Sequence, residues 1–379
     1  MQNSEITPKW VGSWSISPAD FSTAPLYLNN QTLRARIKLS IGGTKIRLRF
    51  SNRFGHQPIV LSGVSLALSE TDSDIQESTN LVVTFNGEPS IVIKPNQEMV
   101  MSDQVEINTA DLGSISISLF FSGKTEITTA YLGSSPCFTS VEGDYTDSSL
   151  FLMDNRESGD QPALPLLTGV DVLADDQYSS VVTFGDSITA MDWPDYLAER
   201  LVKEGKKIGV LRQAVGGNKV LNDSPESLQY GTAGIQRFQK DVVHQTGAKC
   251  IVVLHGVNDI IHSCGPHPIS KSVNAEEIIN GLHKYIQWAH ESNMKILGAT
   301  IMPFGGYAGI TSLEEEKRQA VNHWIKTSGK FDGVIDFDAA TQNPEKTNEL
   351  LPEYDSGDHL HPSKQGAKAM SDFVDLDIF

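Results

Sequence analysis

Four short polar segments in the second half of the chain bring together residue types that can do chemistry. The segments are FGDSITA (184–190), AVGGNK (214–219), HGVNDI (255–260) and YDSGDHLHP (354–362). The last segment alone offers two aspartates and two histidines. Such a set suits a metal site, one half of a hydrolase triad, or a polar turn. Which of these three it is depends on the residues that the rest of the chain places beside this segment.

The elements that would position these segments follow a strand-and-helix pattern that begins after Asp176. The strand candidates are 178–184, 207–215, 249–256, 294–302 and 331–337. A helix is predicted over 274–290, where Asn274 and Glu277 are spaced as a capping box. Five apolar strands alternating with helices predict a parallel sheet covered on both sides, which binds ligands at the carboxyl ends of its strands.

The first half of the chain has the alternation of antiparallel strands instead. Besides residues 32–50, strand-like runs lie at 59–68, 80–87, 90–95 and 114–121. No amphipathic helix is evident before about residue 175. Residues 1–175 are therefore expected to form an antiparallel β-sandwich, jelly-roll-like in arrangement, as an accessory domain.

One stretch of this first half predicts a specific strand pairing. Between Thr32 and Phe50, apolar residues occupy alternate positions on both sides of Gly42-Gly43, which predicts a β-hairpin with a glycine turn. The intervening positions hold six basic residues, Arg34, Arg36, Lys38, Lys45, Arg47 and Arg49. We expect this basic face to be solvated and to protect an exposed edge against aggregation.

The polar segments of the second half all follow predicted strands, so their side chains would share one cleft. Ser187 either caps a helix or acts as a nucleophile, and the elbow motif G-x-S-x-G is absent. Gly217 lets the backbone approach a ligand closely, and Asn258 can offer its amide group. Asp358 and His361 are three residues apart, so the carboxylate can hold one ring nitrogen while the other faces Ser187. The set contains a nucleophile, a base, an orienting acid and two oxyanion donors.

The composition excludes some classes of partner. The 379 residues carry a net charge of −17, which disfavours nucleic acids and acidic membranes. No apolar run reaches the roughly 18 residues of a membrane span. The start, MQNSEITPKW, lacks the features of a signal peptide, so we expect a cytoplasmic protein, or a secreted or periplasmic one if a leader has been removed.

In their order and spacing, the motifs of the second half resemble the four blocks of the SGNH, or GDSL-type, esterase and lipase family. The matching motifs are GDSIT (185–189), Gly217, GVND (256–259) and DHLHP (358–362). The resemblance implies a flavodoxin-like hydrolase domain over residues 176–379. Four further motifs, WVGSWSISP, LSIGGTKIRLRFSNRFG, GATIMPFGG and YDSGDHLHP, are similar to a subgroup in which a β-sandwich precedes that domain. Members of this subgroup cleave short acyl esters, some of them on acetylated carbohydrates.

The resemblance also implies a role for each matching residue. The implied nucleophile is Ser187, the base His361, its partner Asp358, and the oxyanion hole the backbone N–H groups of Ser187 and Gly217 with the side chain of Asn258. Two places depart from the family pattern. Ile188 stands for leucine, and Arg212 and Gln213 lie near where relatives carry an asparagine ahead of the glycine.

A metal site competes for some of the same side chains. The candidate ligands are Asp355, Asp358, His359, His361, His262 and His267. A zinc site would need three or four of them to converge. If the triad holds instead, His359 is a turn residue and Asp355 caps or braces the loop, while His255, in a buried strand, is expected to be a satisfied core histidine.

We therefore predict a serine carboxylesterase that hydrolyses short, acetyl-type esters through an acyl-enzyme, with no cofactor and no metal. Its substrate would be a small ester or an acylated carbohydrate. Two alternatives remain: a lipase for longer chains, and a carbohydrate-binding protein whose β-sandwich is the active part and whose hydrolase half is vestigial. The sequence does not indicate an oligomeric state.

Overall fold

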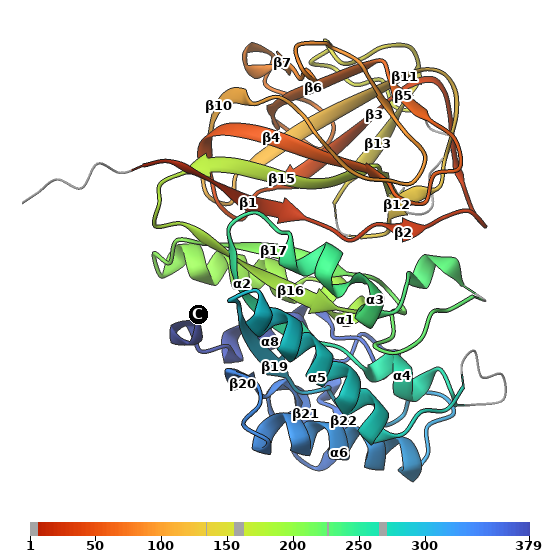
Figure 1. The fold of residues 1–379 in the computed structure, drawn as a ribbon, viewed down its shortest axis with the longest axis vertical. Coiled ribbons are helices and arrows are strands. Elements are labelled where there is room, and N and C mark those ends of the chain that lie inside the picture. The colour runs from red at the N-terminus through yellow and green to blue at the C-terminus, as the bar shows by residue number, and fades with distance from the viewer. Residues whose placement is uncertain (1–6, 134, 155–162, 226, 265–270) are drawn as a thin grey trace, which may run out of the picture. The chain divides into compact units, whose positions relative to one another are not determined.

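The computed structural model describes residues 7–133, 135–154, 163–225, 227–264 and 271–379. These residues form two compact units (Figure 1). The first contains the residues up to Ser179 together with 207–209, and the second contains 180–206 and 210–379. Among the described residues, none of the helices has the length and apolar character to cross a bilayer.

The first unit is rich in strands. They are β1 (Lys9–Ser15), β2 (Ala19–Asp20), β3 (Leu26–Lys38), β4 (Gly43–Asn52), β5 (Ile59–Leu61), β6 (Gly63–Leu68), β7 (Leu81–Val82), β8 (Ile91–Ile93), β9 (Gln97–Met101), β10 (Val105–Thr109), β11 (Ser114–Ile127), β12 (Thr129–Tyr131), β13 (Cys137–Glu142), β14 (Leu164–Pro165) and β15 (Leu167–Ala174). One antiparallel sheet has the order β1-β15-β4-β10, with β9 also paired to β4, and another has the order β13-β3-β11-β6-β7. Smaller sheets are β14-β12-β2 and β5-β8. Apolar side chains of both large sheets belong to one core.

The hairpin predicted over residues 32–50 is wrong. β3 pairs with β11 and β13, whereas β4 pairs with β15, β10 and β9, so the two strands lie in different sheets. Gly42 and Gly43 therefore connect two sheets, and the N–H of Gly42 donates to Asp111 at 2.7 Å. Alternation identifies the inward face of each strand, and both strands do turn that face to the common core. It does not identify the neighbouring strand, and that is the reason for the error.

The basic face predicted for this stretch is also wrong in part, because two of its arginines are buried. The Arg34 guanidinium donates to Ser118 Oγ at 2.8 Å and to three backbone carbonyls. Arg49 is 5% exposed, and its Nε lies 3.3 Å from the carboxylate of Asp171, which has no exposed surface. β3 and β4 are both flanked by strands on two sides, so neither of them is an edge.

The second unit is built on a five-stranded sheet. Its strands are β16 (Ser179–Gly185), β17 (Ile208–Ala214), β18 (Ala248–Leu254), β19 (Lys295–Ala299) and β20 (Gly333–Ile335), in the order β17-β16-β18-β19-β20. The pairs β16–β18, β18–β19 and β19–β20 are parallel. All five predicted strands are thus confirmed. The order reverses beside β16, and such a reversal is where open α/β sheets bind their ligands.

Helices of the second unit lie between and after these strands in the sequence. They are α1 (Ser187–Ala190), α2 (Trp193–Lys203), α3 (Gly234–Phe238), α4 (Val257–Ile261), α5 (Ala275–Glu291), α6 (Ser312–Thr327), α7 (Phe337–Thr341) and α8 (Lys364–Phe373), and a short pair of strands, β21 (Gln342–Asn343) and β22 (Lys346–Leu350), follows α7. α2, α7 and α8 pack together, as do α3, α5 and α6. Two such groups are expected when helices cover both faces of a parallel sheet. The predicted helix is α5, and its capping box between Asn274 and Glu277 is present.

Candidate active site

Ser187 is the first residue of α1, directly after β16. The helix is capped by the neighbouring residue, because Asp186 accepts the N–H of Ile188 at 3.1 Å. The Ser187 hydroxyl is therefore not used as the cap. It lies 2.7 Å from Nε2 of His361, at the carboxyl end of the strand.

A second contact joins Asp358 to His361, with 2.6 Å between Oδ2 of the aspartate and Nδ1 of the histidine. Burial alone would raise the pKa of Asp358, but hydrogen bonds from the ring and backbone of His361 and from the Leu360 N–H lower it well below its usual range. The carboxylate is therefore ionised at neutral pH and can only accept hydrogen bonds. It follows that Nδ1 of His361 carries the proton and that Nε2 is free to accept one from Ser187.

The glycine pair after β17 passes beside the serine. A Cβ atom built on Gly216 would lie 4.0 Å from Cβ of Ser187. Gly217 has a φ of +73°, in the left-handed region that favours glycine, and a Cβ there would lie 2.3 Å from the ring of Tyr230. The loop therefore requires glycine at position 217 for two reasons, its backbone conformation and the ring packed against it.

Asn258 joins the same group from the end of β18. The residue is 2% exposed, and its Nδ2 donates to the backbone carbonyl of Asn218 at 3.0 Å. An amide nitrogen carries two hydrogens, so one remains for a ligand. The structure thus brings Ser187, the glycine loop and Asn258 together at three neighbouring strand ends.

Two residues that the sequence did not single out hold this loop in place. Asn218 donates from Nδ2 to the carbonyls of Tyr230 and Thr232 at 2.6 and 2.8 Å, and its Oδ1 accepts from Nε of Arg237 at 2.9 Å. The buried Arg237 also donates to the carbonyl of Gly185 at 2.8 Å. The asparagine that supports the loop therefore follows Gly217 instead of preceding it. Asn218 adjoins a motif, but nothing near Arg237 in the sequence marks it.

Two buried carboxylates flank the site. Asp259, beside Asn258, accepts the backbone N–H groups of Val220 and Leu221 at 2.7 and 3.1 Å, and so fixes the chain that follows the glycine loop. Burial raises the pKa of Asp259 to about 6 and that of Asp186 to about 7. Both carboxyl groups accept backbone N–H groups near the strand ends.

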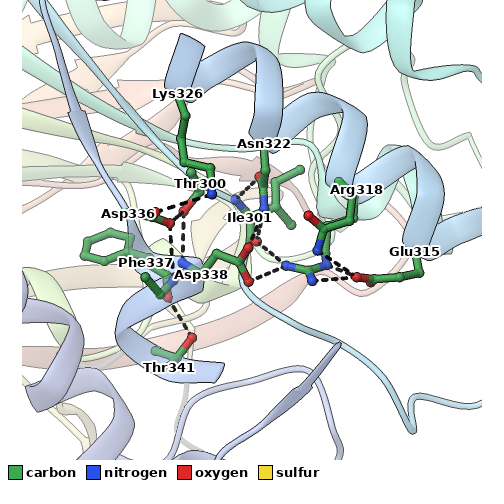
Figure 2. A network of polar contacts seen from close by, with 12 residues as sticks. Thr300, Ile301, Glu315, Arg318, Asn322, Lys326, Asp336, Phe337, Asp338 and Thr341 are labelled. Atoms are coloured by element: carbon green, nitrogen blue, oxygen red, sulfur yellow. Dashed lines mark hydrogen bonds and ion pairs between the residues drawn. The ribbon is translucent and has the colours of Figure 1, made fainter. Parts of the chain in front are cut away.

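The loop after β19 rests on a buried polar network (Figure 2). The N–H of Ile301 donates to Asn322 at 2.7 Å, and its carbonyl accepts from Arg318 at 3.0 Å. Arg318 is fully buried and pairs with Asp338 at 2.6 Å and with Glu315 at 2.7 Å. Because a buried guanidinium must satisfy its donors, this network holds the start of the loop on α6.

The other histidines singled out in the sequence have different environments. His359 has a φ of +63° in a turn, and its Nδ1 lies 2.7 Å from Oδ2 of Asp355. His255 is buried between the Tyr285 hydroxyl and the Asn218 carbonyl, each at 3.3 Å, as expected of a satisfied core histidine. His267 lies outside the described residues. Within those residues, no group of three or more His, Cys, Asp or Glu side chains is placed to hold a metal ion.

Comparison with known proteins assigns residues 181–374 to a family. The model of the GDSL-like lipase/acylhydrolase family matches residues 181–374, half of the chain. No curated protein matches the chain. Similar solved structures include a putative acylhydrolase from Bacteroides fragilis, with 19% identity over 54% of this chain and 88% of that one and a TM-score of 0.41. Another is the acetylxylan esterase Axe2 from Geobacillus stearothermophilus, with 19% identity over 52% of this chain and 93% of that one and a TM-score of 0.40.

The chain belongs to the GDSL-like lipase/acylhydrolase family. It is accordingly a carboxylic ester hydrolase, and the second unit carries the hydrolase fold. The family expected from the four sequence motifs is thereby confirmed.

Proposed function

We propose that this protein is a serine carboxylesterase that hydrolyses short acyl esters through an acyl-enzyme on Ser187. One observation carries the proposal: the unbroken contact from Asp358 through His361 to the Ser187 hydroxyl, at 2.6 and 2.7 Å. A nucleophile, its base and the group that orients the base are within hydrogen-bonding reach of one another, which is the requirement for nucleophilic catalysis by serine.

The reaction would proceed in two halves. As Oγ of Ser187 attacks the ester carbonyl, Nε2 of His361 takes its proton and then delivers it to the leaving alcohol. The ionised carboxylate of Asp358 stabilises the imidazolium that forms. Water, activated by the same histidine, then attacks the acyl-enzyme and releases the acid.

The negative oxygen of each tetrahedral intermediate needs donors, and three groups supply them in this proposal. They are the backbone N–H groups of Ser187 and Gly217 and the side-chain amide of Asn258. Support comes from the left-handed φ of Gly217, from the packing of Tyr230 on it, and from the hydrogen bond of Asn258 to the Asn218 carbonyl, which uses only one of its two amide hydrogens. Donors held in advance of the reaction stabilise the developing charge without reorganisation.

The substrate class is part of the proposal. The Tyr230 ring packs beside Gly217 of the oxyanion loop, and His262 stacks on it with 5.4 Å between ring centroids. Two rings packed beside the oxyanion loop leave less room there for a long acyl chain than small side chains would. We propose acetyl-type esters, with acetylated carbohydrates as a candidate class, ahead of long-chain lipids.

The organisation of the chain completes the proposal. Residues 1–175 would form an antiparallel β-sandwich, jelly-roll-like in arrangement, that serves as an accessory domain, and residues 176–379 the flavodoxin-like catalytic domain. Two large antiparallel sheets that share one core support the sandwich. The order β17-β16-β18-β19-β20 supports the flavodoxin-like topology.

The test compares wild type with Ser187→Ala on a series of p-nitrophenyl esters from acetyl to palmitoyl. We expect the acetyl ester to be the best substrate, the variant to lose nearly all turnover while remaining folded, and a chelator to have no effect. Wild-type turnover by Ser187→Ala would overturn the nucleophile. Preference for palmitoyl would favour the lipase, and no turnover by wild type on any ester would favour a binding protein.

A further inference from the structure

The loop that carries His361 contains a second aspartate–histidine pair with nearly the same geometry as the first. Nδ1 of His359 lies 2.7 Å from Oδ2 of Asp355, compared with 2.6 Å between His361 and Asp358. The mechanism proposed above uses only the Asp358–His361 pair. The role of the Asp355–His359 pair therefore has to be explained separately.

Asp355 binds the backbone of the loop as well as the ring. Its Oδ1 accepts the N–H of Gly357 at 2.8 Å and the N–H of His359 at 3.0 Å. One carboxylate thus receives three hydrogen bonds, and all of them come from the four residues that follow it. Its side chain is 11% exposed, so water competes weakly for these bonds.

The bonds of Asp355 restrain a loop whose ends are already joined. The N–H of Ser363 donates to the carbonyl of Tyr354 at 2.7 Å, and the N–H of Ser356 donates to the carbonyl of His361 at 3.0 Å. Between these two bonds the chain must place both Asp358 and His361. The positive φ of His359 is a conformation that costs energy for a residue with a side chain, so it persists only under restraint.

The ring of His359 touches a second element of the site. A Cβ atom built on Gly306 would lie 3.1 Å from Cγ of His359, so the ring rests on the backbone of the loop after β19. The N–H of Gly305 in that loop donates to the carbonyl of Asn348. Its start is held by Ile301 in the network of Figure 2. His359 therefore links the loop of the catalytic pair to a firmly anchored neighbour.

We propose that Asp355 is a positioning residue: with His359 it holds the 355–361 loop so that Nε2 of His361 reaches the Ser187 hydroxyl. This inference rests on the proposed function, because it assigns Asp355 an effect on that reaction. Neither Asp355 nor His359 needs to touch the substrate. A displacement of about 1 Å at a reacting group can cost on the order of 100-fold in rate.

The test measures kcat and KM of the full chain on p-nitrophenyl acetate for Asp355→Ala and Asp355→Asn. Active-site titration with a phosphonate that modifies Ser187 counts the competent molecules. We expect Asp355→Ala to lower kcat by about 10- to 100-fold with KM within about twofold of wild type. Asp355→Asn keeps an oxygen for the two backbone N–H groups, so it should recover part of this loss.

A matched control is available in the same unit. Asp332 also binds a histidine, at 3.0 Å from Nε2 of His290, and accepts the Ile296 N–H at 2.8 Å, but it lies at the amino ends of the strands. Asp332→Ala should reduce stability and leave kcat per titrated site unchanged.

Two results would overturn the proposal. One is wild-type kcat per titrated site in Asp355→Ala, or in Asp355→Asn should the alanine variant not fold. The other is a loss of kcat that Asp332→Ala reproduces. Failure of the proposed function would be seen separately, as wild-type turnover by Ser187→Ala measured in the same series.

Discussion

The two aspartate–histidine pairs of the 355–361 loop differ less in their own geometry than in what surrounds them. In both, Nδ1 of the ring faces a carboxylate that also accepts two backbone N–H groups. The His361 side chain is 26% exposed and its second nitrogen meets Ser187, whereas that of His359 is 54% exposed and its ring rests on Gly306. An ordered imidazole is therefore not sufficient for a catalytic base, because the group that faces its second nitrogen decides its role.

The carboxylates differ in the opposite sense. Asp358, which orients the proposed base, is 46% exposed, while Asp355 is 11% exposed. Both carboxylates bind backbone N–H groups, and Asp358 makes its bonds at a partly exposed site. The backbone bonds of Asp355 are better shielded, and such bonds hold best where water is excluded.

The largest expected difference between the two pairs is in kcat when each histidine is replaced in turn. His361→Gln removes the proposed base and should lower kcat by about 10,000-fold or more. His359→Gln removes the ring bond to Asp355 and the contact of the ring with Gly306, and it should lower kcat at most roughly 10-fold, since it shifts the loop slightly. Steady-state kinetics on p-nitrophenyl acetate would compare them, and similar losses in both variants would show that the two pairs share one role.

Removal of a proposed oxyanion donor leaves both aspartate–histidine pairs intact, so it separates their effects on kcat from that of the oxyanion hole. Asn258→Ala should lower kcat by about 100- to 1,000-fold, as expected for a donor that binds the transition state more strongly than the substrate. KM should change little. A main effect on KM would assign Asn258 to substrate binding instead, and circular dichroism would verify that the bond lost to Asn218 has not disturbed the fold.

The smallest expected effect concerns stability and pH. The lowered pKa of Asp358 means that its ionised form is favoured by folding, so its contribution is present above its unfolded pKa of about 3.8 and is lost as the pH falls through the folded value. Because the pair is partly exposed, this contribution should be about 1 kcal/mol or less. Urea unfolding of wild type and Asp358→Asn should show a constant difference above about pH 5, and this difference should shrink as the pH falls below about 4. A difference that does not vary with pH would contradict the assignment.

Much of the second unit followed from its sequence. Short apolar strands alternating with helices predicted all five strands of the sheet and the capped helix α5. This pattern is local, since burial on both faces makes each strand apolar throughout. The order of the motifs then predicted that Ser187, Gly217, Asn258 and His361 would meet, because the carboxyl ends of parallel strands share one edge.

The first unit was less predictable, and Arg34 shows the reason. Alternation marked it as outward-facing, yet the segments that contribute the Ser73, Tyr145 and Ser148 carbonyls bury it. Likewise β3 and β4 alternate as hairpin partners would, but each pairs with distant strands. Long-range pairing depends on which faces find a common core, and residues close in sequence do not encode that choice.

The contrast between what the local sequence predicts and what long-range contacts decide also applies to the segment YDSGDHLHP. Its sequence alone determined that two carboxylates and two imidazoles lie within reach of one another, since their spacing is short. The pairing of Asp358 with His361 and the contact of His361 with Ser187 were expected from the sequence, whereas only the tertiary structure decided that Asp355 pairs with His359 and that the His359 ring rests on Gly306. The physical reason is that each ring binds a carboxylate within the loop, whereas what the rest of the ring meets, Ser187 or Gly306, comes from elements far away in the chain.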